Sequence, residues 1–235
     1  MRDVIELKEL SNQLKGLSVA DSINELVNVF PGKVVFTTSF GIEDQVITHI
    51  IFKNELPVEV ITLDTGRLFP ETYKVFAETT LKYGKQINVF FPDHSDIEKM
   101  VTEKGPYSFY QSKENRIECC RLRKVVPLRR ALENKSVWIS GIRAEQSENR
   151  ALMNNLEYDE DKQVIKFHPL LEWSLENVES FIRENDIPYN SLHNKGYVSI
   201  GCEPCTRAVI KGQDFRSGRW WWEVDSSKEC GCHIK

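Results

Sequence analysis

The spacing of hydrophobic residues changes in a regular alternation along this chain. Between residues 33 and 140, short runs of consecutive apolar residues alternate with stretches in which apolar residues recur every three or four positions. A short apolar run predicts a buried strand, and the longer period predicts a helix. The four predicted strands are Val34–Phe36, Val58–Leu63, Gln86–Phe91 and Val137–Ser140. Strands that alternate with helices favour an α/β fold with a doubly wound, mainly parallel sheet.

The helical stretches have recognisable starts. Residues 1–30 predict two helices, the second beginning after Ser18 or Asp21, and further helices follow Gly41, Pro70 and Asp93. Proline at residue 70 suits a first helical turn. From Ala208 onward the apolar period fades into Arg, Gly, Trp and Lys. We therefore expect a nucleotide-binding-type α/β domain over residues 1–207 and a mobile C-terminal tail over residues 208–235.

Composition narrows the class of protein. The chain has 235 residues, 40% of them hydrophobic, and a formal net charge of −4. That charge argues against general nucleic-acid binding. No apolar run approaches the ~20 residues that cross a bilayer, and the N-terminus lacks the apolar region of a signal peptide. We expect a cytoplasmic protein, in which six cysteines indicate metal, cluster or redox chemistry rather than structural disulfides. Self-association into a homo-oligomer is left open.

Three polar loops follow predicted strands, where a doubly wound sheet binds its ligands. Gly41, within the first loop, lets the backbone approach an anion, although an ordinary strand–helix turn explains it equally well. The second loop contains Asp64 and Thr65. The third spaces Arg143 and Arg150 about two helical turns apart, where they either clamp an anion or are simply solvated. The loops together favour a nucleotide pocket.

Longer motifs carry a family resemblance. Ser39-Phe40-Gly41-Ile42-Glu43-Asp44 resembles the phosphate loop of the PP-loop ATP pyrophosphatases. The stretches LDTGRLFPETY (63–73), GIRAEQSENRA (141–151), FHPLLEWS (167–174) and SIGCEPCTRAV (199–209) are similar to those of the sulfonucleotide reductases, which reduce adenylyl sulfate (APS) or its 3′-phosphorylated form (PAPS) to sulfite. Phe40 and Glu43-Asp44 depart from the ATP-cleaving pattern, which speaks against ATP cleavage. The resemblance implies a PP-loop-type sheet and substrate contacts from Ser39, Gly41, Asp44, Asp64 and Thr65.

Four cysteines form a pair and a Cys-x-x-Cys motif: Cys119, Cys120, Cys202 and Cys205. Four thiolates hold either zinc or an iron–sulfur cluster. Adjacent cysteines can hardly chelate one zinc ion without strain, whereas a cluster spreads its ligand positions over several irons. The sequence therefore favours a [4Fe–4S] cluster over zinc or four unrelated thiols. The resemblance implies the same cluster, which marks the APS-preferring reductases, although some members with this quartet also accept PAPS.

Cationic side chains recur near the cysteines and in the tail. Lys124 is five residues beyond Cys119, and Pro127 should kink or restart that helix. The resemblance implies that Lys124 lies between cluster and substrate. Arg216 and Arg219 precede three tryptophans, and that segment either docks its rings or uses its guanidinium groups on the phosphosulfate. Four cationic side chains would together offset the charge repulsion between a thiolate and an anionic substrate: Lys124, Arg143, Arg216 and Arg219.

The last residues hold the candidate nucleophile. Cys230 lies in a polar Glu-Cys-Gly-Cys-His ending, so its sulfur has little packing role. We expect its thiolate to attack the sulfuryl group, releasing AMP and leaving an S-sulfocysteine. The resemblance implies thioredoxin or glutaredoxin as the reductant that frees sulfite. Cys232 replaces the family's aliphatic residue and is either a small apolar substitute or a resolving thiol. His233 either orients Cys230 or has no role.

Other activities stay open from sequence alone. A dual APS and PAPS reductase fits the same motifs. A PP-loop sulfur transferase acting on tRNA would need ATP chemistry and a basic surface, which Phe40 and the net charge disfavour. An inactive iron–sulfur sensor is disfavoured by the intact tail cysteine.

Overall fold

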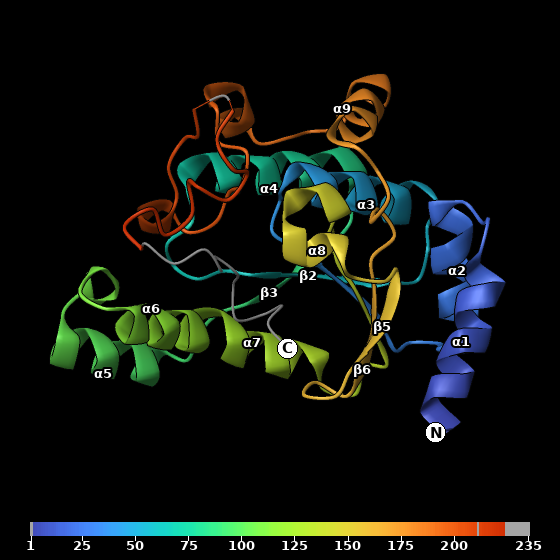
Figure 1. Cartoon of the computed structure of the whole chain (residues 1–235), viewed down its shortest axis with the longest axis horizontal. Helices are drawn as coiled ribbons and strands as arrows, with labels where there is room; N and C mark the ends of the chain where they lie inside the picture. Colours follow the sequence, from blue (N-terminus) through green and yellow to red (C-terminus); the bar gives the residue numbers. More distant parts are fainter. Residues whose placement is uncertain (1, 211, 224–235) are drawn as a thin grey trace.

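A six-stranded sheet divides the molecule into layers in the computed structural model (Figure 1). The structure describes residues 2–210 and 212–223, and for residues 2–6 it describes the backbone alone. The strand order is β3-β2-β1-β4-β6-β5. The strands are β1 (Val34–Thr38), β2 (Glu59–Leu63), β3 (Asn88–Phe90), β4 (Val137–Ile139), β5 (Leu156–Asp159) and β6 (Val164–Phe167). All neighbouring strands are parallel except the β5–β6 pair. The predicted doubly wound, mainly parallel sheet is confirmed.

Helices cover both faces of the sheet, with α3 and α4 on one face and α6 and α7 on the other in Figure 1. Near the N-terminus are α1 (Arg2–Leu14), α2 (Val19–Val29) and α3 (Ile42–Lys53). The central helices are α4 (Pro70–Tyr83), α5 (His94–Lys104), α6 (Lys113–Cys120) and α7 (Val126–Leu132), and later come α8 (Glu148–Ala151) and α9 (Leu175–Glu184). Ser18 caps α2 and Pro70 opens α4, as their residue types favour. None of the described helices is long and apolar enough to cross a membrane.

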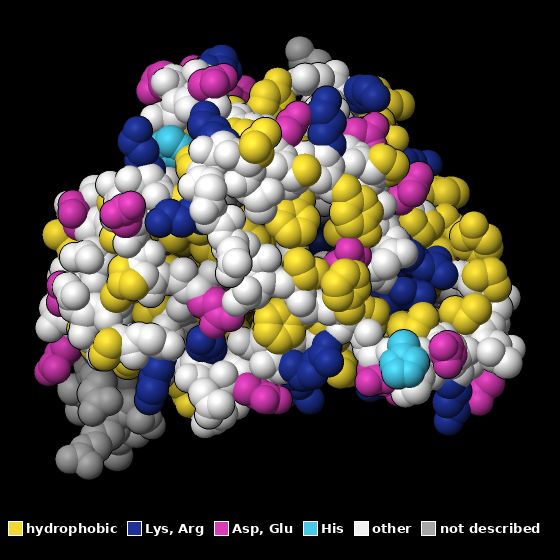
Figure 2. All heavy atoms as spheres, turned by 180° about the vertical axis from the view of Figure 1, so that it is seen from behind, with side chains coloured by type: hydrophobic (Ala, Val, Ile, Leu, Met, Phe, Trp, Pro, Cys, Tyr) yellow, Lys and Arg dark blue, Asp and Glu magenta, His cyan; other side chains and the backbone are white. Residues whose placement is uncertain are grey.

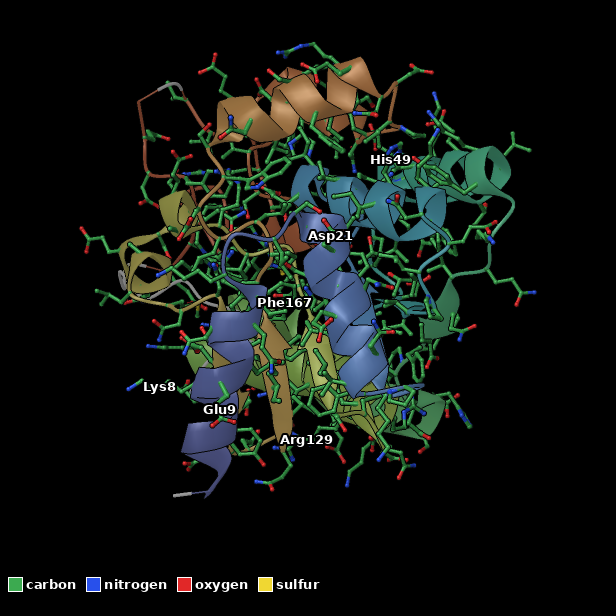
Figure 3. The ribbon with its side chains drawn as sticks, turned by 90° about the vertical axis from the view of Figure 1, so that its right-hand side faces the viewer. Lys8, Glu9, Asp21, His49, Arg129 and Phe167 are labelled. Carbon is green, nitrogen blue, oxygen red and sulfur yellow. The ribbon has the colours of Figure 1, made fainter. Side chains whose placement is uncertain are left out.

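The central strands β1 and β4 are continuous apolar runs in sequence because both of their faces are buried. In β1, Val34 and Phe36 belong to the large core beneath α2, α3 and α9, while Val35 belongs to a second core beneath α7. Successive side chains of a strand point to opposite faces, so covering both faces requires an apolar residue at every position. Phe167 of β6 lies in the larger core behind α1 and α2, whereas Lys8 and Glu9 face outward (Figure 3).

The β5–β6 hairpin is absent from the sequence prediction. Its register pairs Glu157 with Lys166 and Asp159 with Val164. Asp159 and Lys166 are buried yet charged, and Lys166 Nζ lies 2.5 Å from Asp159 Oδ2. Because this ion pair occupies positions that normally hold apolar residues, the hydrophobic alternation typical of a strand is hidden.

The described part of the predicted tail packs against the domain. The backbone N–H of Arg207 donates to Gly218 O, and that of Trp220 donates to Cys205 O. Thr206 and Arg219 form an isolated antiparallel bridge. The Trp220 side chain is 1% exposed and joins a small core with Met100, Phe109 and Leu122. Residues 215–223 therefore form one wall of the region described next.

Candidate active site

A cavity of about 210 Å³ opens at the carboxyl ends of β1, β2 and β4. Parallel α/β sheets bind ligands at this edge. Seven of the substrate-binding residues predicted from the sequence line it: Ser39, Gly41, Asp44, Thr65, Lys124, Arg216 and Arg219. The topology thus gathers side chains that lie up to 180 positions apart in the chain. Asp64 and Arg143 do not line the cavity but are buried next in sequence to Thr65 and Ile142, which do. Cys230, Cys232 and His233 fall outside the described residues.

The loop after β1 is shaped by a strained residue. Phe40 has φ +58°, a left-handed conformation that glycine adopts easily and phenylalanine rarely does. Its ring is 1% exposed and stacks on Phe76 at 4.9 Å, and its N–H donates to Thr38 Oγ1 at 3.0 Å. Burial of the ring holds the strained backbone in place. The turn presents Ser39 and Gly41 at the start of α3, where free N–H groups favour an anion.

Asp44 ties this loop to the first turn of α3. Its Oδ2 accepts hydrogen bonds from Ser39 N at 2.6 Å and from Ser39 Oγ at 2.7 Å. Burial nevertheless raises the pKa of Asp44 from 3.8 to about 6, because desolvation outweighs the two hydrogen bonds. The carboxyl group therefore changes charge near pH 6, on the wall of a cavity that cationic side chains also line.

Arg143 is occupied by carboxylates inside the wall. Its guanidinium donates from Nε to Glu43 Oε1 at 2.9 Å and pairs with Glu145 at 2.8 Å. The side chain is 1% exposed. Gln146 and Arg150, which neighbour it in space, do line the cavity. In this arrangement Arg143 holds Glu43 and the loop in position, and Arg150 is the member of the predicted arginine pair that reaches the cavity.

The loop after β2 links the two halves of the site. Asp64 accepts from Gly66 N at 2.7 Å and from the Tyr73 hydroxyl at 3.0 Å, and burial with this carboxylate raises the pKa of Tyr73 to about 12. Asp64 thus fixes the turn that presents its neighbour. Thr65 lines the cavity, and its hydroxyl lies 3.3 Å from Cys202 Sγ.

Arg216 and Arg219 enter the cavity from the C-terminal segment. Both guanidinium groups lie over the Trp220 ring, at 5.9 and 4.9 Å from its centroid. A Cβ on Gly201 would collide with the Arg219 guanidinium, so glycine there gives the arginine its space. Arg219 Nε is buried without a hydrogen-bond partner. A buried guanidinium with an unsatisfied donor is suited to receive an anion.

All four predicted ligand cysteines line a second, small cavity of about 20 Å³. Cys119 and Cys120 end α6, while Cys202 precedes a short 3₁₀ turn and Cys205 ends it. All four are free cysteines, and burial with Cys202 nearby raises the pKa of Cys205 to about 12. The same cavity is lined by four cationic side chains: Arg67, Arg116, Arg123 and Lys124. On the face seen in Figure 2, Lys and Arg side chains lie in a hollow among hydrophobic ones.

A distorted helical turn explains how two adjacent cysteines and Lys124 share this region. Residues Arg121–Val125 form a π-helical turn, in which Val126 N donates to Arg121 O. Pro127 has no N–H to donate to the carbonyl four residues earlier, so the helix widens before α7 begins. The predicted restart at Pro127 is confirmed. Lys124 lines both cavities.

Cysteine thiols are the candidate metal donors in the small cavity. Within the described ranges, no three His, Cys, Asp or Glu side chains are arranged to hold one metal ion. Four thiols nevertheless converge on one enclosed space with cations around it. Four thiolates around several irons are the usual ligand set of an iron–sulfur cluster. The residues present are thus chemically suited to a cluster.

Several site residues escape the sequence reasoning. Arg67, Arg116 and Arg123 face the cysteine cavity, and Gln146 and His193 line the larger one. Arg67 lies within the quoted 63–73 motif but is one of several polar residues there, and nothing next to Arg116 distinguishes it from a solvated charge. Their place in the lining of the cysteine cavity is what identifies them as site residues. Arg123, between Cys120 and Lys124, is the one that its neighbours could have flagged.

Comparison with known proteins decides the family. The model of the phosphoadenosine phosphosulfate reductase domain matches residues 33–208. The chain belongs to this family. A curated relative named adenosine 5′-phosphosulfate reductase, from Agrobacterium fabrum, is 45% identical over 225 residues, covering 96% of this chain and 86% of the relative. One of the same name from Allochromatium vinosum is 48% identical over 200 residues, covering 85% and 78%.

Solved structures of this reductase family and of more distant proteins share the fold. A phosphoadenylyl-sulfate reductase from Candida auris, solved as a phosphate complex, superposes with a TM-score of 0.73 and 28% identity, covering 86% of this chain and 96% of that one. An FMN adenylyltransferase from Candida glabrata has a TM-score of 0.55 and 18% identity, covering 90% and 76%. The second similarity supports the predicted PP-loop-type nucleotide fold and nothing finer.

Proposed function

We propose that this chain reduces adenylyl sulfate to sulfite and AMP in assimilatory sulfate reduction, with Cys230 as the nucleophile. One observation carries the proposal: Lys124 lines both the cavity of the phosphate loop and the cavity of the four cysteines. The curated relatives named adenosine 5′-phosphosulfate reductase support the same substrate. The four cysteines of the small cavity are free thiols, which suits a cytoplasmic enzyme.

The first step exchanges one bond to sulfur for another. The Cys230 thiolate attacks the sulfuryl sulfur, a sulfur–sulfur bond forms, and the sulfur–oxygen bond to the phosphate breaks. AMP leaves with the electron pair of that bond. Lys124, Arg216 and Arg219 would compensate the charge on the phosphosulfate as the thiolate approaches. Ser39 and Gly41, at the start of α3, would bind the phosphate.

The second step frees the product. A thiolate of a dithiol reductant, proposed to be thioredoxin or glutaredoxin, attacks the Cys230 sulfur. Sulfite leaves with the electron pair of the sulfur–sulfur bond, and the second thiol of the reductant resolves the mixed disulfide. The reductant is thereby oxidised to its disulfide and Cys230 returns to a thiol.

Cys119, Cys120, Cys202 and Cys205 would hold the proposed [4Fe–4S] cluster. When bound, it would cross-link α6 to the segment around the Cys-x-x-Cys motif and add to the electrostatics beside Lys124. The chain's own residues carry the chemistry described above. Substitution of Cys119 by serine is expected to abolish the visible absorbance and bound iron of anaerobically purified protein.

One assay separates the candidate activities. Anaerobically purified protein is given APS or PAPS with reduced thioredoxin, and sulfite and AMP (or its 3′-phosphorylated form) are measured. We expect sulfite from APS, with Cys230→Ser inactive and Arg129→Gln, at an exposed ion pair that lines neither cavity, fully active. Comparable rates with PAPS would make the enzyme a dual reductase. The absence of sulfite from either substrate would contradict the proposal and leave the tRNA sulfur transferase or sensor alternatives.

A further inference from the structure

A buried ion pair joins α6 to the end of the described chain. Arg116 Nε donates to Glu223 Oε1 at 2.8 Å, and Arg116 Nη2 donates to Glu223 Oε2 at the same distance. The two side chains are 5% and 10% exposed. This bidentate geometry is the strongest form of an arginine–carboxylate pair, and burial protects it from screening by salt.

Arg116 also contacts the cysteine cavity. It hydrogen-bonds the Cys120 side chain, and its guanidinium lies 4.7 Å from the centroid of Trp220. Burial alone would lower the pKa of Arg116, but the hydrogen bonds and charge of Glu223, with a smaller contribution from Cys120, raise it. One guanidinium therefore serves both a predicted cluster ligand and the C-terminal segment.

Glu223 holds a special position in the chain. Its N–H donates to Trp220 O at 2.9 Å, and Trp220 N donates to Cys205 O at 3.1 Å. Cys230 is the seventh residue after Glu223. At ~3.5 Å per extended residue, Cys230 lies within about 25 Å of Glu223 whatever conformation the intervening residues adopt. Glu223 is thus the attachment point that sets how far the proposed nucleophile reaches.

We propose that Arg116 and Glu223 are positioning residues for Cys230: their ion pair fixes the root of the nucleophile-bearing segment beside the cysteine cavity. The inference rests on the proposed function, because it takes Cys230 as the nucleophile. Neither side chain lines the larger cavity, so the pair acts on substrate only through the segment that it anchors.

Loss of the anchor lengthens the tether. The next fixed point is Trp222, whose ring packs against Phe109 and Tyr110 with centroids 6.1 and 4.4 Å apart, so eight residues instead of seven would lead to Cys230. Effective concentration falls roughly as the −3/2 power of tether length, which gives only about a 1.2-fold loss from length alone. The main effect is therefore loss of the direction that the ion pair imposes on the segment, and we expect the rate of adduct formation to fall by about twofold or more.

The test compares Glu223→Gln with Asp161→Asn. The second variant also removes a carboxylate from an arginine pair, but an exposed one with side chains 59% and 61% accessible. Three quantities are measured on anaerobically purified protein: the iron content, the affinity for AMP, and the single-turnover rate of S-sulfocysteine formation from saturating APS, followed by intact mass. A fourth, the rate of tryptic cleavage after Lys228 without ligand, needs no chemistry at Cys230.

We expect Glu223→Gln to keep its iron and its AMP affinity, to form adduct at least about twofold more slowly, and to be cleaved faster after Lys228. Asp161→Asn should match the wild type. Glu223→Asp, which retains the charge, should recover most of the rate and serves as the second variant if the glutamine form does not fold. Unchanged adduct and cleavage rates would overturn the inference, as would loss of iron, which would make the pair a structural support of the cysteine cavity. If wild type forms no adduct, the proposed function fails, and the cleavage rates still decide whether Glu223 anchors the segment.

Discussion

Gly141 is closely packed against the start of α3, and its replacement by alanine gives a sharp prediction. A Cβ at this position would meet Asp44 Oδ1 well inside the 3.0 Å that real Cβ atoms keep. It would also lie 3.2 Å from Glu43 Cβ and 3.3 Å from Asp44 N, so the first turn of α3 prevents the new methyl group from moving away from the carboxylate. Gly141→Ala therefore has to displace the Asp44 carboxylate or separate α3 from the end of β4.

The cost follows from what Asp44 loses by moving. Its Oδ2 accepts two short hydrogen bonds from Ser39, and hydrogen bonds to a charged group contribute about 1.5–3 kcal/mol each. Partial loss of both, or overpacking of the backbone, gives an expected destabilisation of about 2–4 kcal/mol. For a chain of this size each kcal/mol lowers Tm by about 2–4 °C, so the melting temperature should fall by roughly 4–16 °C. The phosphate loop should move with Asp44, so AMP affinity should fall as well.

The assay is a double-mutant cycle in thermal or denaturant unfolding, with AMP binding measured in parallel. Asp44→Ala combined with Gly141→Ala should recover at least about 1 kcal/mol of the expected additive loss, because the clash disappears with the carboxylate. Gly41→Ala is the control: Gly41 has φ −68°, and the nearest atom to its Cβ would be Ser39 Oγ at 3.5 Å, so it should cost no more than about 1 kcal/mol. A loss of stability below 0.5 kcal/mol for Gly141→Ala, or a cycle without coupling, would refute the steric argument.

Three further predictions concern other parts of the molecule. Burial lowers the pKa of His168 from 6.5 to about 4. The free energy of unfolding should therefore be highest above pH 6.5 and fall by about 3 kcal/mol as the pH drops toward 4, because the unfolded chain binds a proton that the folded chain does not. His168→Asn should flatten this acidic part of the stability curve, and an unchanged curve would exclude His168 as its source. Arg143→Ala should destabilise the fold by about 3–5 kcal/mol because Glu43 is left buried and unpaired, and adding Glu43→Gln should restore part of the loss, whereas additive losses would contradict the pairing. If Cys232 resolves the adduct, wild type should release sulfite in a single turnover without added thiol while forming a Cys230–Cys232 disulfide, and Cys232→Leu should retain it; full retention by both would dismiss the resolving role.

Strands β1 to β4 and the loops of the site could be predicted from the sequence because their signals are local. A strand with both faces buried can be recognised in the sequence as an apolar run, as at Val34–Phe36. The cysteine quartet and the Ser39–Asp44 loop are compact motifs with a known chemistry. Pro127 predicts the break in its helix because proline has no backbone N–H to donate.

The remainder depends on partners distant in sequence. Arg143 looks like an anion clamp until Glu43, 100 residues earlier, is placed against it. Arg116 has no distinguishing neighbours, yet its carboxylate partner lies 107 residues later. The β5–β6 hairpin hides its pattern because Lys166 and Asp159 neutralise each other inside the fold. Such pairings leave no periodicity, so single-sequence reasoning has no means of detecting them.

The arrangement of the sheet edges has a consequence for solution behaviour. A strand at an edge offers unpaired backbone groups to any other chain, and long, flat edges invite aggregation. Here β5 turns back antiparallel on β6, carries charged side chains and contacts α1, while β3 at the opposite edge is only three residues long. Neither edge is a good template for adding a strand from another molecule. If copies of this chain associate, we expect them to meet through helical or loop surfaces and to leave each sheet separate.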